Sequence, residues 1–311
     1  MTIREYAASD EPQLIDLWNK CLPFDTINQE ILCRRIICDE NFDSSLFMVA
    51  ENANNELTGF IYGAVCKALE VDSLEAWVIA FGVHPKWRLR GIGSNLLVAL
   101  ETAFQGRGTK TIELGGYAPN YFFPGVDKDA YEGAVTFFKS HGYIEKSICC
   151  AMDMSLRGYK MPEKAAKKRS ALEDAGYKFL AFRLQDSLAV LSFMREAFPE
   201  WVNNMRDSIL HGRAEKTVIL AWSPKGEVVG FVMRGMDGTE ERFGPFGVLP
   251  SMQGKGIGGI LFHALMSSMV AGRIFYTYFL WGEGENIDMY GSWGMKRFRE
   301  YMMMGKTLHV G

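Results

Sequence analysis

The chain has 311 residues, which is enough for two domains of ordinary size. Hydrophobic residues make up 48% and charged residues 23%, a composition typical of folded globular proteins and not of disordered ones. The 34 Lys and Arg residues nearly balance 37 Asp and Glu, for a net charge of −3. We therefore expect no general attraction to nucleic acid or to anionic membranes.

Two further features bear on location and metal binding. No segment approaches the ~20 continuous apolar residues of a membrane helix, and the first residues lack the apolar core of a secretion signal. The six Cys residues form no C-x-x-C pair, and no Cys/His cluster has zinc spacing. Unpaired thiols are typical of reducing compartments. We expect a cytoplasmic protein without a metal site.

The first half of the chain alternates between strand and helix patterns. Asp10 is a plausible helix N-cap, and an Asn-rich turn separates two apolar strand segments further on. In order, the patterns predict a helix after Asp10, strands over 46–51, 57–66 and 76–83, a helix over 91–104 and a strand over 110–114.

An internal repeat is the most informative feature of the sequence. Residues 81–100 and 246–265, related by a shift of 165, are identical at 10 of 20 positions. Weaker similarities flank them in the same order, including an aromatic residue four positions before a glycine: Phe138 before Gly142, and Tyr290 before Gly294. The chain is therefore interpreted as a tandem duplication.

The duplication predicts the domain organisation. We expect domain 1 over residues 1–158 and domain 2 over residues 159–311, the second beginning with a linker helix within Met161 to Gly176. Each domain is expected to be α/β, with a mixed, mostly antiparallel sheet and helices on both faces. The linker's basic run fits a solvated helix face better than a binding site.

Each repeated block runs from an apolar strand through a glycine-rich turn into an apolar helix. A helix N-terminus offers unpaired N–H groups and the positive end of a dipole, which favour phosphate. Closely spaced glycines let the backbone approach an anion, and nearby Arg or Lys adds charge for a diphosphate. The alternative is that these glycines serve only a tight strand–helix turn.

The spacing is neither that of a dinucleotide fingerprint nor that of a P-loop. It resembles the acetyl-CoA pyrophosphate signature of the GNAT superfamily of N-acetyltransferases: R-x-x-G-x-G begins at Arg88 and Q-x-x-G-x-G at Gln253, each after a V-x-P strand end. The resemblance implies that CoA lies between two splayed parallel strands, its pantetheine arm adding to the sheet edge. It also implies direct acetyl transfer from the thioester to an amine.

The resemblance assigns a cofactor-binding set to each copy. In the first copy the expected residues are Val83, Arg88, Arg90, Gly91, Gly93 and Ser94. In the second they are Val248, Gln253, Gly254, Lys255, Gly256, Gly258 and Gly259.

Catalytic candidates follow from the same resemblance. Family members use a Tyr near the thioester sulfur as general acid, which Tyr290 matches; Phe138 at the corresponding place has no proton to donate. Glu75 and Glu240 each lie eight residues before the signature valine, on its face if the strand has no bulge, and are candidate bases. The alternatives are that both Glu side chains are solvated carboxylates at a strand edge, or that the amine loses its proton to water. We expect the chemistry in the second copy.

Carboxylates also precede the repeated aromatic residue in each copy. Asp127, Asp129 and Glu132 follow an aromatic loop in the first, and Glu283, Glu285 and Asp288 occupy the corresponding stretch of the second. Beside aromatic rings they would attract a cationic amine, although ordinary solvated loop acids are the alternative.

Two functions of different class remain from the sequence. The first is an acetyl-CoA-dependent N-acetyltransferase acting on a primary amine of a small molecule or peptide, as monomer or homodimer. The second is a non-catalytic acyl-CoA-binding module in which one or both copies are degenerate, as Phe138 suggests for the first copy.

Overall fold

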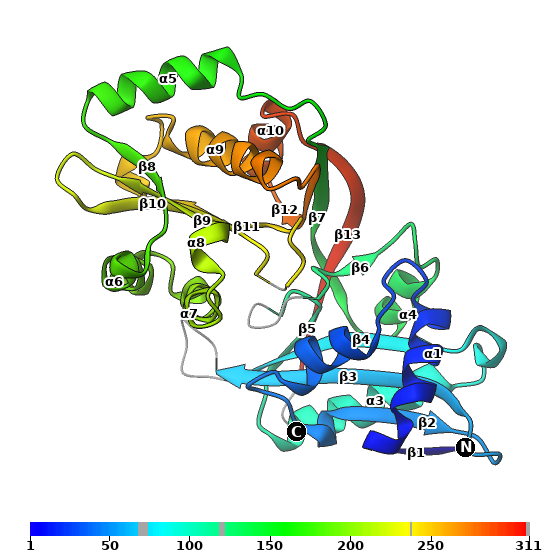
Figure 1. The fold of residues 1–311 in the computed structure, drawn as a ribbon. Coiled ribbons are helices and arrows are strands. Elements are labelled where there is room, and N and C mark those ends of the chain that lie inside the picture. Colours follow the sequence, from blue (N-terminus) through cyan, green and yellow to red (C-terminus); the bar gives the residue numbers. More distant parts are fainter. Residues whose placement is uncertain (68–73, 118–121, 237, 309–311) are drawn as a thin grey trace. The chain divides into compact units, whose positions relative to one another are not determined.

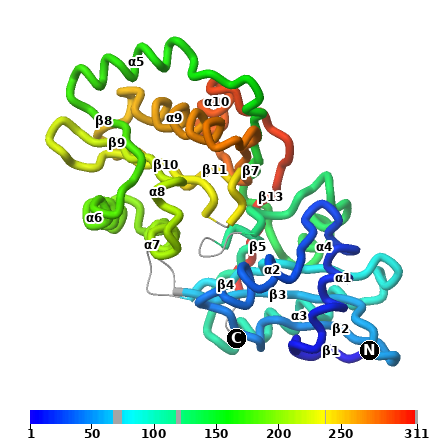
Figure 2. The backbone as a smooth tube through the Cα atoms, viewed as in Figure 1, coloured from blue at the N-terminus to red at the C-terminus, as the bar shows by residue number. Residues whose placement is uncertain are grey.

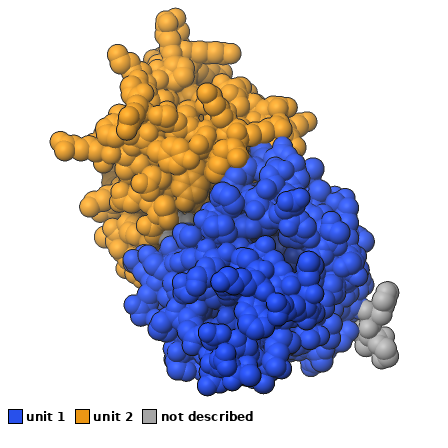
Figure 3. Space-filling model, turned by 90° about the vertical axis from the view of Figure 1, so that its right-hand side faces the viewer, with its two compact units in different colours: residues 1–150, 299–311 blue, residues 151–298 orange. Residues whose placement is uncertain are grey.

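The computed structural model describes residues 1–67, 74–117, 122–236 and 238–308. It divides into two compact units, residues 1–150 with 299–311 and residues 151–298 (Figure 3). Among the described helices, none is long and apolar enough to cross a membrane. The six cysteines, all within the described ranges, form no disulfide.

Unit 1 is built on a mixed sheet with helices on both faces (Figure 1). Its strands follow the order β1-β2-β3-β4-β5-β13-β7, in which β13 is Lys296–Thr307. The elements are β1 (Thr2–Glu5), α1 (Glu11–Cys21), α2 (Gln29–Leu32), β2 (Phe47–Glu51), β3 (Leu57–Lys67), β4 (Leu74–Val83), α3 (Ile92–Gly106), β5 (Thr111–Leu114), β6 (Val126–Asp127), α4 (Ala134–Ser140) and β7 (Ile144–Ser155).

Two apolar layers form the core of unit 1. Leu14, Leu17 and Trp18 of α1 pack on one face of the sheet, where Trp18 stacks on Phe60 with ring centroids 4.9 Å apart. On the other face, Leu96 and Leu100 of α3 are fully buried. Every third or fourth residue of each helix is apolar, so each helix buries one stripe against the sheet.

Unit 2 repeats the plan. The four-stranded sheet has the order β11-β10-β9-β8, and β12 lies beside β7. The elements are α5 (Glu163–Asp174), β8 (Lys178–Ala181), α6 (Ser187–Ala197), α7 (Val202–Leu210), α8 (Ala214–Thr217), β9 (Val218–Trp222), β10 (Val228–Arg234), β11 (Phe243–Val248), α9 (Ile257–Ala271), β12 (Tyr276–Gly282), α10 (Glu285–Ser292) and β13 (Lys296–Thr307). The tandem α/β organisation predicted from the repeat is confirmed.

The two long strands β7 and β13 each have residues in both units. In unit 1, β13 pairs antiparallel with β5, with Met304 opposite Leu114, and Lys306 forms an ion pair with Glu101 of α3 at 2.7 Å. Figure 2 shows the chain returning to unit 1 through this last strand. The compact units thus divide the chain at 150 and 299, whereas a boundary at 158 remains a prediction for the repeat itself.

Asp10 occupies the N-cap position of α1, as predicted, but its side chain makes no capping hydrogen bond to that helix. Asp10 has helical backbone angles and caps no N–H of α1; instead its carboxylate accepts the backbone N–H of Ala7 at 2.9 Å and pairs with Arg4 at 2.6 Å. Asp186 accepts the N–H of Arg183 in the same way, at 3.0 Å. A short 3₁₀ turn precedes both α1 and α6. Asp10 is the last residue of the first turn, and Asp186 is the last residue of the second.

The packing of β13 into unit 1 predicts the effect of shortening one side chain. Met304 is 1% exposed, so Met304→Ala should lower the free energy of unfolding by about 2–4 kcal/mol through lost burial and a cavity. Val98→Ala, on the exposed side of α3, should change it by no more than about 0.5 kcal/mol. Urea unfolding followed by circular dichroism measures both. Equal stability of the two variants would contradict this packing.

Candidate functional site

The candidate site of unit 1 lies where two parallel strands separate. β4 and β5 pair through Ala76, Trp77 and Val78, the last opposite Leu114, and the N–H of Gly115 donates to the Val78 carbonyl at 2.9 Å. Beyond this point the strands diverge, and a cavity of about 770 Å³ occupies the gap. Because β4 continues to Val83, part of its edge on this side has no strand partner among the residues that the structure describes.

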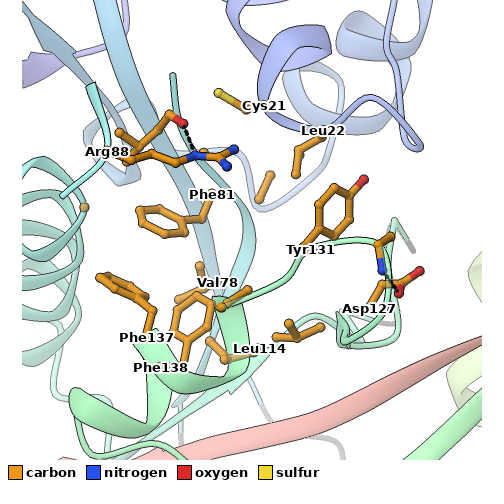
Figure 4. A pocket seen from close by; sticks show the side chains of 18 of the residues that line it. Cys21, Leu22, Val78, Phe81, Arg88, Leu114, Asp127, Tyr131, Phe137 and Phe138 are labelled. Atoms are coloured by element: carbon orange, nitrogen blue, oxygen red, sulfur yellow. Dashed lines mark hydrogen bonds between the residues drawn. The ribbon is translucent and has the colours of Figure 1, made fainter. Parts of the chain in front are cut away.

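Figure 4 shows how the cavity is lined. Arg88, Phe81 and Phe137 lie on one side, and Tyr131 and Asp127 on the other. Phe81 and Phe137 stack with centroids 5.3 Å apart. The walls between these two ends are apolar. The cavity therefore has a cationic end, an apolar middle and an acidic end.

The cationic end is the first glycine-rich turn. After a 3₁₀ turn over Pro85–Trp87, Leu89 and Gly91 both have positive φ, +59° and +79°. A Cβ at Gly91 would meet nothing within 4 Å, so the space beside the turn is open. α3 begins at Ile92, and the first N–H groups of a helix have no partner within it. These groups can hold an anion.

Two arginines flank this turn. Arg88 donates from Nε to the carbonyl of Val83 at 3.1 Å, which holds its side chain along the end of β4. Arg90 lies over the ring of Trp87, 4.9 Å from the centroid. Both arginines are exposed, and Arg88 lines the cavity. Gly93 and Ser94 also line it, with Ser94 held by His141 at 3.0 Å.

The second turn has the same backbone conformation. Gly254 and Gly256 have φ of +77° and +88°, and Gln253 donates to the Val248 carbonyl at 3.5 Å, as Arg88 does to Val83. Its surroundings differ. A Cβ at Gly256 would meet Lys168 of α5 at 3.0 Å, because the stem of Lys168 lies over the turn. The amine of Lys255 is 3.3 Å from the sulfur of Met252.

The remaining glycines of the second set pack against rings. A Cβ at Gly258 would come within 3.0 Å of Phe246, and one at Gly259 within 3.5 Å of Trp293. The approach at Gly258 is tight, so a side chain there would require Phe246 to move, whereas the contact at Gly259 is an ordinary one. Both contacts bring the first turn of α9 against an aromatic cluster.

That cluster lies between the strands of unit 2 that correspond to β4 and β5. At a shift of 165, Val78 and Leu114 are replaced by Phe243 and Phe279, whose ring centroids are 5.9 Å apart and whose exposures are 4% and 6%. Tyr290 packs 4.7 Å from Phe279. Larger side chains thus occupy the place that corresponds to the open gap of unit 1.

Tyr290, the expected general acid, is half-buried in this cluster. Its ring also contacts those of Phe243 and Trp293, at 5.6 and 5.5 Å. Burial raises the pKa of its phenol. In unit 1 the corresponding Phe138 lines the cavity.

The sequence predicts that Glu75 and Glu240 lie on the same strand face as the signature valine only if the strands have no bulge. Both strands have a bulge. In β4, Ala80 and Val78 pair with consecutive residues of β3, so Ile79 is the extra residue. In β11 the register also shifts, between Phe246 and Phe243. A bulge reverses which face the residues beyond it occupy, so the even offset from valine does not place either Glu on the valine's face.

Glu75 sits opposite Cys66 on β3. Burial and then the charge of Glu75 raise the pKa of that thiol to about 11. Glu240 is exposed in the turn before β11, and its carbonyl accepts from Arg234 at 3.0 Å. The structure brings neither carboxylate together with the glycine-rich turns.

The acidic end of the cavity contains a network that sequence reasoning missed. Arg299 donates to both oxygens of Asp25, at 2.7 and 2.8 Å, and from Nε to Asp127 at 2.6 Å. Tyr131 donates its hydroxyl proton to Asp25. These partners are up to 274 positions apart, so no local pattern could reveal them. Asp127 was singled out from sequence, but as a possible amine attractor.

Four of the other five loop carboxylates are exposed, and Glu283 is half-buried. Asp129 and Glu132 are exposed, although Glu132 also lines the cavity, and Glu285 and Asp288 of α10 are exposed in unit 2. Among the described residues, no group of three or more His, Cys, Asp or Glu is arranged to hold a metal ion.

Comparison with known proteins agrees with this geometry. Residues 10–143 match the acetyltransferase (GNAT) family. Over 98% of this chain, the fold is similar to a fungal GCN5-related glucosamine N-acetyltransferase region of a multi-domain GH3 β-N-acetylglucosaminidase, with a TM-score of 0.85 and 19% identity; the match covers 38% of that longer chain.

Two further structures match along nearly their whole length. A GCN5-related N-acetyltransferase from Sphaerobacter thermophilus has a TM-score of 0.71 at 18% identity, covering 100% of this chain and 96% of the other. A tandem GNAT protein from the clavulanic acid biosynthesis pathway has 0.67 at 14%, covering 100% and 99%. Residues 10–143 therefore match the GNAT acetyltransferase family, and the chain as a whole has the fold of a tandem GNAT protein.

Proposed function

We propose that the chain is an acetyl-CoA-dependent N-acetyltransferase and that acetyl transfer takes place in unit 1. The observation that carries this proposal is the 770 Å³ cavity in the gap between β4 and β5, which joins an open glycine-rich turn to an acidic end. The sequence favoured the second copy because of Tyr290. The open gap in unit 1 and the aromatic residues at the corresponding place in unit 2 favour the first.

Each part of acetyl-CoA has a matching feature in unit 1. The pyrophosphate would accept hydrogen bonds from the first N–H groups of α3 and from Arg88 and Arg90. The pantetheine amides would pair with the free edge of β4 beyond Val78, as an added strand does. The apolar walls, including Phe81 and Phe137, would cover the arm and exclude water.

The chemistry requires three proton movements. A cationic amine first loses one proton, which frees its lone pair. The nitrogen then forms a bond to the acetyl carbon, the carbon–sulfur bond breaks, the nitrogen loses a second proton and the CoA thiolate gains one. A thiol has a pKa of ~8.5, so the thiolate leaves readily without a dedicated acid. Proximity in the gap would supply most of the rate acceleration. Phe138 is then compatible with catalysis, and the amine protons pass to water.

On this proposal the residues of the second copy support the fold. Tyr290 fills the corresponding gap, and Lys168 covers the turn at Gly256. Glu75 and Glu240 remain predictions from the sequence as bases. The alternative, a non-catalytic acyl-CoA-binding module, is favoured for unit 2 by that filled gap.

The acceptor we propose to test first is an amino sugar. The fungal region with TM-score 0.85 is described as a glucosamine N-acetyltransferase. At the acidic end of the cavity Asp25 and Asp127 pair with Arg299, and the exposed Glu132 also lines the cavity, so this end suits a cationic amine. The cytoplasm is the proposed location.

The function is tested by thiol release from acetyl-CoA in the presence of glucosamine and other small amines, with the acetylated product identified by mass spectrometry. We expect turnover with at least one small amine. Binding of CoA without turnover across a broad panel would favour the binding module instead.

The cationic end yields a prediction with a matched control. Arg88→Gln removes a charge from the turn and gives it the residue found at the corresponding Gln253, so the Kd for CoA should rise about tenfold or more, as for loss of a charge-assisted hydrogen bond. Gln253→Ala should leave the Kd unchanged within a factor of about two. Calorimetry of CoA binding measures both. The opposite ranking would place the CoA site in unit 2.

A second prediction concerns the gap itself. Leu114→Phe gives unit 1 the side chain that unit 2 has at the corresponding Phe279. The ring should obstruct the position of the thioester and reduce turnover at least about tenfold, because a small misplacement of reacting groups is costly. Tyr290→Phe should keep kcat within a factor of about two. Steady-state kinetics, with melting curves to verify folding, give the comparison. Loss of activity in Tyr290→Phe alone would return the chemistry to the second copy.

A further inference from the structure

The wall of the cavity includes a buried hydroxyl without a partner. Tyr301 is 1% exposed and lines the cavity, and its OH has no hydrogen-bond partner among the residues that the structure describes. Buried polar groups are normally satisfied, and an unsatisfied one calls for an explanation. A ligand in the cavity would supply the missing partner.

Tyr301 belongs to the acidic end. It pairs with Asp127 in the register between β13 and β6, and the guanidinium of Arg299 lies over its ring at 5.0 Å. Arg299 and Tyr301 are two positions apart on β13, so both side chains lie on the same face of the strand. Tyr301 therefore adjoins the Asp25–Arg299–Asp127 network at the end of the cavity away from Arg88.

All four carboxylate oxygens of the network already accept hydrogen bonds within unit 1. Both oxygens of Asp25 accept from Arg299, and one also accepts from Tyr131. Asp127 accepts from Arg299 at one oxygen and from the N–H groups of Asp129 and Ala130 at the other, at 3.0 and 2.8 Å. Two carboxylates share one guanidinium, so the network keeps a net charge of about −1 that favours a cation nearby.

The chemistry of the acceptor decides what Tyr301 can bind. Burial raises the pKa of its phenol, so the hydroxyl stays protonated and can donate. The reacting amine must direct its lone pair at the thioester carbon, so that nitrogen cannot also accept the phenol proton. The partner of Tyr301 must be a second polar atom of the same molecule.

We propose that Tyr301 is an acceptor-binding residue whose hydroxyl donates to a hydroxyl oxygen close to the reacting amine, so that the acceptors are small cationic amino alcohols, amino sugars among them. The inference rests on the proposed function and adds a specificity residue to it. Tyr301 comes from the last strand of the chain, so the site of the first copy is completed by the C-terminal segment.

The test uses two amines that differ by one hydroxyl group, 2-aminocyclohexanol and cyclohexylamine, together with glucosamine. In the 311-residue chain, kcat/KM for 2-aminocyclohexanol should exceed that for cyclohexylamine by about five- to tenfold, the contribution of one hydrogen bond to a buried group. Tyr301→Phe should remove this preference and raise KM for glucosamine, while KM for acetyl-CoA stays unchanged.

Tyr62→Phe is the matched control. Tyr62, on β3, also has a buried hydroxyl without a partner among the described residues, but it does not line the cavity. It should keep the wild-type preference, and melting curves should show that both variants fold.

The possible failures are distinguishable. An active wild type without the preference, or a Tyr301→Phe variant that retains it, overturns the inference alone. No thiol release with any of the three amines overturns the proposal that the chain acetylates small hydroxylated amines, and this inference with it.

Discussion

The early end of pairing between two parallel strands is the constraint on which the rest of unit 1 depends. β4 and β5 stay together only to Val78 and Leu114. Past that point the backbone groups of β4 that face the gap need another partner, because buried peptide groups are costly when unpaired. The bulge at Ile79 falls at the same place and bends the strand. An open slot with a hydrogen-bonding edge follows from these two features, and the turn at Gly91 stands at one end of it.

The glycine-rich turns of the two copies have the same backbone conformation but different surroundings. The turns agree in φ within about 20° at each positive-φ position, and the same side chain to carbonyl bond closes both. What differs is side-chain volume around them. Phe243 and Phe279 stand where the first copy has Val78 and Leu114, and the stem of Lys168 lies on Gly256 where Gly91 is open. Divergence of a few side chains, with the fold kept, is enough to close one gap and leave the other open.

The sequence predicted the features that depend on local pattern. The repeat, the strand–turn–helix of each signature and the tandem fold could be derived because they depend on residues close together in the chain. The face of Glu75 could not, since a bulge of one residue at Ile79 reverses the alternation. The filled gap of the second copy could have been predicted by aligning the copies at the shift of 165, which places Phe243 where the first copy has Val78. Both side chains are apolar, and they differ in volume. Arg299 and Tyr301 join Asp25 only through β13, and no spacing in the sequence indicates that return.

A crystal structure of the 311-residue chain with acetyl-CoA would locate the CoA site. We expect the pyrophosphate at the N–H groups of α3 beside Gly91, the pantetheine arm along β4 beyond Val78, and the thioester facing the end of the cavity where Tyr301 lies. Acetyl-CoA bound instead between β11 and β12, with its pyrophosphate at Gly256 and its sulfur beside Tyr290, would contradict this expectation.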